Sequence, residues 1–173
     1  MCLLMLCGSI GLPDSGCVTT DRIEFQLEES FPPSIVSAAD ADYPLNQIGA
    51  LNLDDPVEAP EALLQTVVRD PNFDETLEYR IFLDSFEPPP AVERPIQEGT
   101  IGPSGFLDRF PVFAIPFTRL EAGQCHKIEL VVVGTFASGS VEPRRPVIPG
   151  DFDQVTWWIR VTDADEPLAT ECQ

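Results

Sequence analysis

Two stretches of this chain indicate its fold most clearly, namely HKIELVV at residues 126–132 and VTWWIRV at residues 155–161. In both stretches every second side chain is large and apolar, namely Ile128, Leu130 and Val132 in the first and Val155, Trp157, Ile159 and Val161 in the second. A period of two places these side chains on one face of an extended strand. Because strands that are neighbours in sequence pair about two-thirds of the time, we expect these two to form an antiparallel pair.

Elsewhere in the chain, further strands are indicated by alternation of apolar and polar residues or by short apolar runs. They are predicted at residues 22–28, 48–53, 63–68, 77–83 and 110–118. The last contains Pro111 and Pro116, which restrict it to an edge or a bulged strand. Residues 34–44 are small and acidic and are predicted to be loop, and no segment keeps a helical period of 3.6. The chain is therefore predicted to be all-β, an antiparallel β-sandwich of about seven strands.

The length of 173 residues suits one domain with a leader and a tether. We expect a signal peptide at residues 1–16, a lipidated N-terminus, tether and first strand at 17–30, and the sandwich at 31–173. About 140 residues is long for one such domain. A Pro-rich insertion is therefore predicted near residues 86–110, where Glu87 is followed by three prolines.

The leader, MCLLMLCGSIGL at residues 1–12, carries no charge. This run is too short to span a bilayer but suits the apolar region of a signal peptide. Pro13 ends it, and Ser15 and Gly16 then precede Cys17. Residues 12–17 resemble the cleavage motif of bacterial lipoproteins. The resemblance implies cleavage before Cys17, lipids on that residue, and a membrane-anchored protein of the cell envelope that faces the periplasm or the cell surface.

This resemblance has two departures. Asp14 stands where such motifs carry an apolar residue, and no Lys or Arg precedes the apolar run. The alternatives are an ordinary signal peptide, which predicts a secreted protein, and a buried N-terminal strand.

The five cysteines divide in a way that fits export. Cys2 and Cys7 fall in the leader and Cys17 is the predicted lipid site, which leaves Cys125 and Cys172 as an even pair. In an oxidising compartment such a pair is expected to form a disulfide, here one that ties the C-terminal tail to a strand. The alternative is two free thiols, because cysteine is also a good small core residue.

Three short motifs narrow the type of sandwich. Residues 69–79, RDPNFDETLEY, resemble an acidic turn of cadherin-like and related bacterial immunoglobulin-like domains, and FPPSI at 31–35 resembles the Pro-Pro segment before their first strand. Residues 120–126 are similar to the fibronectin type III pattern Leu-x-Pro-Gly-x-x-Tyr, with Ala122 for the proline and His126 for the tyrosine. These resemblances imply an immunoglobulin-like sandwich in which His126 makes the structural bond at a strand corner. They imply no particular ligand, because this fold hosts unrelated functions.

The acidic turn also raises the question of calcium. Asp70, Asn72 and Asp74 present oxygen ligands at alternate positions, the spacing with which calcium loops begin. The turn lacks the glycine and the distal glutamate of an EF-hand, so that motif is excluded. The alternatives are a calcium site, completed by other acidic groups such as residues 40–42 or 163–166, and a turn held only by side-chain hydrogen bonds.

The net charge of −19 excludes some classes of partner. A surface this negative repels phosphate backbones and anionic membranes, so nucleic-acid binding is not expected. Metal cations and basic partners stay compatible with it. No cofactor is expected, apart from the calcium considered above.

Catalysis is not expected from the remaining motifs. His126 is the only imidazole, and its alternation with Ile128 and Leu130 turns it inward, as a structural histidine would be. No nucleophile elbow, phosphate loop or His-Glu-x-x-His motif occurs. Trp157 and Trp158 put one indole on each face of a strand; one belongs in the core, and the other is either covered by the tail or free to anchor a partner.

We therefore expect a non-catalytic envelope lipoprotein that acts in adhesion, scaffolding or assembly through protein contacts. A calcium-dependent module that binds carbohydrate or another ligand is the alternative. A hydrolase with an unrecognised site comes third and would have to use His126.

Overall fold

The computed structural model describes residues 31–38, 43–45, 47–53, 61–85, 94–139, 142–162 and 172. The predicted signal peptide, the lipidation site Cys17 and the strand predicted at residues 22–28 lie outside these ranges, as do the acidic groups at 40–42 and 163–166. Within the described ranges, no helix has the length and apolar character needed to cross a membrane.

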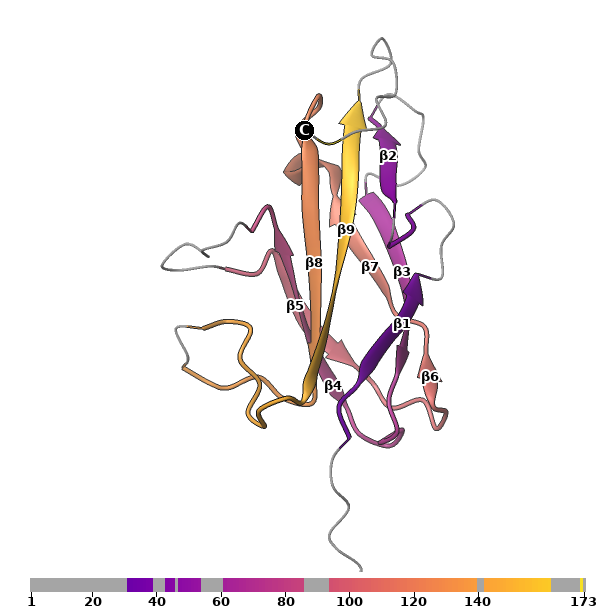
Figure 1. Cartoon of the computed structure of the whole chain (residues 1–173), viewed down its shortest axis with the longest axis vertical. Helices are drawn as coiled ribbons and strands as arrows, with labels where there is room; N and C mark the ends of the chain where they lie inside the picture. The colour runs from indigo at the N-terminus through magenta and orange to yellow at the C-terminus, as the bar shows by residue number, and fades with distance from the viewer. Residues whose placement is uncertain are drawn as a thin grey trace, which may run out of the picture.

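The strands of the described part of the chain form two sheets (Figure 1). The first sheet contains β1 (Ser34–Ala38), β3 (Glu61–Arg69), β6 (Asp108–Arg109) and β7 (Val112–Pro116). Here β3 is central, with β1 on one side and β6 and β7 on the other.

The second sheet has the order β2-β9-β8-β4-β5. Its strands are β2 (Ile48–Asn52), β9 (Phe152–Thr162), β8 (Cys125–Val133), β4 (Leu77–Leu83) and β5 (Gln97–Ile101). The pair β2 and β9 is parallel and every other described pair is antiparallel. A single turn of 3-10 helix, η1 (Phe117–Arg119), separates β7 from β8. The predicted all-β sandwich is confirmed.

The central pair of the second sheet is the one expected from the alternation. β8 and β9 run antiparallel in a register that places His126 opposite Ile159 and Ile128 opposite Trp157. Their inward side chains meet those of the first sheet in one core, which contains Leu64, Val68, Phe113, Ile115, Ile81, Ile128, Leu130, Trp157 and Ile159. Full burial of side chains this large contributes about 1.5–3 kcal/mol each. The energy gained in this core therefore determines which face of each strand turns inward.

A second apolar cluster explains why β8 is buried on both faces. Phe82, Val131, Val133 and Phe136 pack together on the outer face of the second sheet. The guanidinium of Arg144 stacks on Phe82, with its Cζ 4.3 Å from the centre of the ring, and its Nη2 lies 2.9 Å from Oε2 of Glu129. The connection between β8 and β9 therefore covers this face, which is consistent with the continuous apolar run at residues 130–133.

One loop prediction is wrong, and one strand was not predicted. Ser34–Ala38 forms strand β1, although its sequence shows no alternation, because it pairs along β3 and the Thr66 hydroxyl donates to the carbonyl of Ser37 at 2.8 Å. Residues 97–101 form β5, which pairs with β4, inside the stretch interpreted as an insertion. Both are edge strands, in which backbone pairing rather than a buried face sets the conformation.

Candidate interaction surface

An open groove lies beside β6 and the loop that precedes it. Its volume is about 630 Å³, and it is lined by Ile101, Gly102, Ser104 and residues 106–111. Phe106 is 74 % exposed and Phe110 69 %, and Leu107 and Val112 are exposed beside them. Contiguous exposed apolar side chains mark interaction sites on soluble domains. We call this feature the β6 groove.

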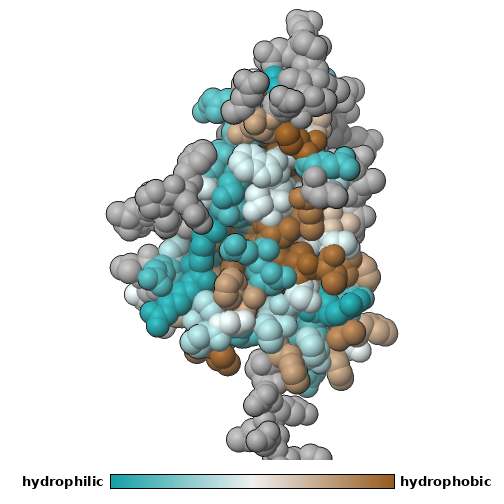
Figure 2. All heavy atoms as spheres, viewed as in Figure 1, coloured by the Kyte–Doolittle hydropathy of each residue, from teal (hydrophilic) through white to brown (hydrophobic). Residues whose placement is uncertain are grey.

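Other exposed apolar side chains lie on the same sheet. Val36 of β1 and Leu63 of β3 are both exposed. In the view of Figure 2, hydrophobic residues gather on the side where β1 and β3 lie, and hydrophilic residues on the side of β5.

Arg109 ties the segments that line the β6 groove together by hydrogen bonds. This guanidinium is 2 % exposed, and its Nη1 donates to the carbonyls of Ile101 at 3.1 Å and Gly102 at 3.3 Å. At the loop tip the hydroxyl of Ser104 accepts from the N–H of Phe106 at 3.1 Å, and Gly105 has a φ of +70° that favours glycine. The aromatic side chains thus project from a braced loop, which lowers the entropy cost of binding a partner.

The turn considered for calcium contains a buried ion pair. Asp70 is fully buried, and its Oδ2 lies 2.6 Å from Nη2 of Arg109. Its Oδ1 accepts the backbone N–H of Asn72 at 2.9 Å, and the Asn72 amide donates to the carbonyl of Phe31. Asp74 is exposed. Asp70 and Asn72, two of the three predicted calcium ligands, therefore already have protein partners. The guanidinium of Arg109 lies beside Asp70, where a calcium ion was considered.

Within the described ranges, no group of three or more His, Cys, Asp or Glu side chains could hold a metal ion. Calcium binding at this turn stays a prediction, and it would require Asp70 to exchange Arg109 for the ion.

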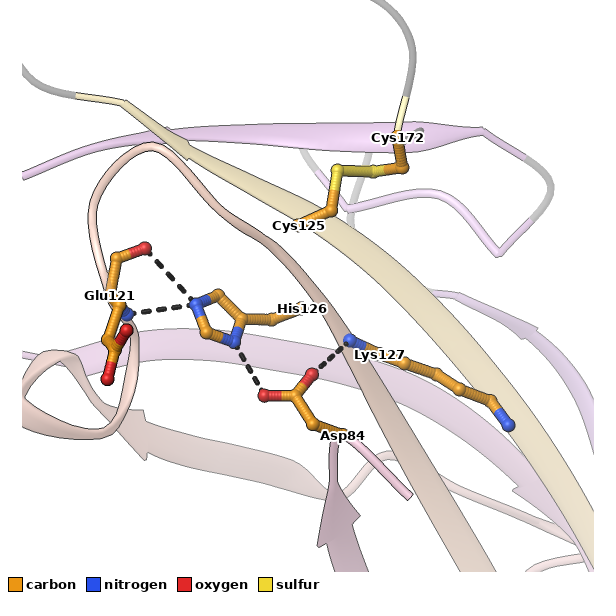
Figure 3. The surroundings of a disulfide bond; sticks show 6 residues. All are labelled: Asp84, Glu121, Cys125, His126, Lys127 and Cys172. Carbon is orange, nitrogen blue, oxygen red and sulfur yellow. Dashed lines mark hydrogen bonds and ion pairs between the residues drawn. A yellow bond between two sulfur atoms is a disulfide. The ribbon is translucent and has the colours of Figure 1, made fainter. Parts of the chain in front are cut away.

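His126 lies at the start of β8 with both ring nitrogens engaged (Figure 3). Nε2 accepts the backbone N–H of Glu121 at 2.9 Å, five residues upstream. Nε2 also lies 3.2 Å from the carbonyl oxygen of Glu121, and Nδ1 lies 2.8 Å from Oδ2 of Asp84. The other oxygen of Asp84 accepts the N–H of Lys127 at 2.9 Å. This network joins the end of β4 to the start of β8 and leaves the 3 % exposed imidazole without a free nitrogen for proton transfer.

Cys125 and Cys172 form a disulfide beside this corner (Figure 3). Their Cα atoms are 5.5 Å apart and 47 residues separate them in sequence. The predicted pairing is confirmed. It ties Cys172 to the end of the sandwich at which β8 begins and β9 ends.

The two tryptophans have different surroundings. Trp157 is buried, and its Nε1 donates to the carbonyl of Tyr43 at 3.1 Å. Trp157 is therefore the indole that belongs to the core, and it is not available as a partner anchor. Trp158 is 40 % exposed and lies opposite Ile48 of β2, which is also exposed. Trp158 therefore stays a candidate contact residue.

No protein-family model matches this chain, and no curated protein matches it either. Sequence reasoning missed the β6 groove because residues 102–111 contain neither a strand period nor a known motif. The available signal was the pair Phe106 and Phe110 in a Pro- and Gly-containing segment, where solvated loops usually carry polar side chains.

Proposed function

We propose that this chain is a non-catalytic binding module of the cell envelope that holds a protein partner through the β6 groove. The observation that carries the proposal is the cluster of exposed apolar side chains on a loop braced by Arg109. Aromatic residues on a rigid base are typical anchors of protein interfaces. A second copy of the chain would bring the same charge of −19 and be repelled. We therefore infer that the partner is a different protein with an apolar segment in neutral or basic surroundings.

We also propose that the sandwich is immunoglobulin-like, on the basis of its strand order. In such domains strands A, B and E lie in one sheet and strands G, F and C in the other, with an additional strand beside C in the variable type. In this chain β1 and β3 correspond to A and B, and β9, β8 and β4 correspond to G, F and C. Strand β2 is additional and runs parallel to β9, and β5 lies beside β4. The bond from His126 to the backbone of Glu121 lies where these domains place a tyrosine corner.

The groove can be tested with a photo-crosslinking residue placed at position 106 in cells that naturally export the protein. We expect it to trap one partner protein, because Phe106 is the most exposed aromatic of the groove. Phe110→Ser should lower the yield about tenfold, the effect of removing one interface anchor. The measurement is the band shift of the crosslinked product, identified by mass spectrometry.

Position 152 provides the matched control, because Phe152 is an exposed phenylalanine on β9 in the other sheet. Equal crosslinking at positions 106 and 152, or none at either, would contradict the proposal. A product with twice the mass of the chain would also contradict it, because the partner would then be a second copy.

We also propose that Cys17 carries the lipid that anchors the module, on the basis of Ser15 and Gly16 before it. Expressed in a bacterial host, the protein is expected to partition into the detergent phase, and Cys17→Ser should move it to the aqueous phase. Cys7→Ser is the control and should change nothing. A wild-type protein that is already soluble, with an N-terminus elsewhere than residue 17, would show that the lipid anchor is absent.

A further inference from the structure

A second hollow lies at the other end of the sandwich from the disulfide, where β8 ends and β9 begins, the lower end in Figure 1. Its volume is about 500 Å³, and it is lined by Glu75, Thr76, Gly134, Thr135, Val147, Ile148 and Asp151. The turn between β3 and β4 supplies one wall, and the two ends of the β8–β9 connection supply the rest. This volume lies within the range of small-ligand pockets. We call it the Asp151 cavity.

Asp151 is an unusual residue for such a wall. It is only 5 % exposed, and its Oδ1 is buried with no hydrogen-bond partner among the described residues. The backbone of Gly134 makes the hydrogen bond that the carboxylate does have, and the approach is too close for any side chain at that position. Burial, together with the nearby charge of Asp70, raises the pKa of Asp151. A buried carboxylate with an unpaired oxygen destabilises the folded state unless a cation joins it.

The described chain does not supply that cation at the cavity. No Lys or Arg is among the lining residues. Arg109 is paired with Asp70 at 2.6 Å and with backbone carbonyls. The cavity walls instead add a second carboxylate, Glu75, and two threonine side chains.

The rest of the lining indicates which cation would fit. Val147 and Ile148 are exposed apolar side chains that form part of the same wall. A ligand that satisfies both features has a cationic head for Asp151 and an aliphatic stem for Val147 and Ile148. A metal ion fits less well, because within the described residues no three His, Cys, Asp or Glu side chains are placed to hold one.

We propose that the Asp151 cavity binds an ammonium or guanidinium group carried on an aliphatic chain, with Asp151 as its counter-ion. Such a group can come from a free alkylamine or from a Lys or Arg side chain of a peptide. The proposal is independent of the β6 groove, because the two sites share no lining residue.

The test is a thermal-shift and NMR titration of the full-length, disulfide-intact protein. The probes are pentylammonium, N-acetyl-lysine methylamide and N-acetyl-arginine methylamide, with 1-pentanol as the neutral control. We expect the cations to raise the melting temperature in a saturable way, because they bind only the native state, and 1-pentanol to have no effect. Equal affinity for pentylammonium and the blocked amino acids identifies a free amine as sufficient. At least tenfold tighter binding of a blocked amino acid identifies a peptide side chain as the source.

Asp151→Asn keeps the shape of the side chain and removes its charge. This variant is expected to bind the cations at least tenfold more weakly. Without ligand it should melt at a higher temperature than the wild type, because an unpaired buried charge is gone. Loss of binding then cannot be attributed to loss of folding.

Two further variants test whether the cations bind in the Asp151 cavity. Glu75→Gln should weaken binding, and Asp74→Asn should not, because Asp74 is an exposed carboxylate in the same turn but does not line the cavity. The proposal is overturned if no cation shifts the melting temperature, if 1-pentanol binds as well as pentylammonium, or if Asp151→Asn binds like the wild type. A shift produced by calcium alone and lost in Asp151→Asn would also overturn it, in favour of a metal site.

Discussion

Asp70→Ala is expected to lower the free energy of unfolding by about 3–5 kcal/mol, because it leaves the guanidinium of Arg109 buried without a counter-ion. The side chains of Asp70 and Arg109 are 0 % and 2 % exposed and lie 2.6 Å apart. Arg109 also donates to the carbonyls of Ile101 in the second sheet and Asn72 in the β3–β4 turn. Loss of the pair should therefore loosen contacts between the sheets as well as the turn. Urea unfolding followed by tryptophan fluorescence measures the change.

A neighbouring ion pair supplies the control. Arg69 of β3 and Asp108 of β6 each precede a member of the buried pair and lie 2.8 Å apart, but both side chains are substantially exposed. Arg69→Ala should change stability very little, because exposed pairs are screened by solvent. The double variant Asp70→Asn with Arg109→Met should recover part of the loss, since it removes both charges. An Asp70→Ala protein as stable as Arg69→Ala would show that the buried pair does not stabilise the fold.

Reduction of the disulfide is expected to cost about 3–4 kcal/mol of stability, the value that the chain-entropy model assigns to a loop of this length. The bond closes a loop with a sequence separation of 47 residues and ties Cys172 to the first residue of β8. The melting temperature should therefore fall on reduction. Mass spectrometry of the non-reduced protein should show the Cys125–Cys172 linkage.

The variant Cys125→Ser with Cys172→Ser serves as the control for this measurement. It should match the reduced wild type and should not respond to reductant. Two free thiols in protein recovered from an oxidising compartment would contradict the pairing, and would weaken the argument for export along with it.

How far the sequence predicts the fold depends on whether a strand buries one face. β4, β8 and β9 each bury alternate side chains in the core, so their period of two was visible in the sequence. β1 and β5 lie at sheet edges and were not predicted. Their conformation depends on backbone hydrogen bonds to β3 and β4, and such bonds leave no pattern in the side chains.

The candidate sites divide in a similar way. His126 could be placed from the sequence because its backbone partner, Glu121, is only five residues away. The partner of Asp70 could not be predicted, because Arg109 is 39 residues away in the sequence and could have paired with any of several other carboxylates. The acidic turn resembles the start of a calcium loop because the spacing of its oxygen ligands can be read from neighbouring residues. The contact between Asp70 and Arg109 cannot be read in this way, because these residues are far apart in the sequence.

The sequence by itself determined the all-β class, the pairing of the two central strands and the candidate disulfide. These follow from local periodicity and from the number of cysteines outside the predicted leader and lipid site. Only the tertiary structure decided which carboxylates are paired and which are not. Asp70 meets Arg109, whereas Asp151 is buried with an oxygen that has no described partner. The physical reason is that the energy of a buried charge depends on the groups folded around it, and chain separation along the sequence does not specify those groups.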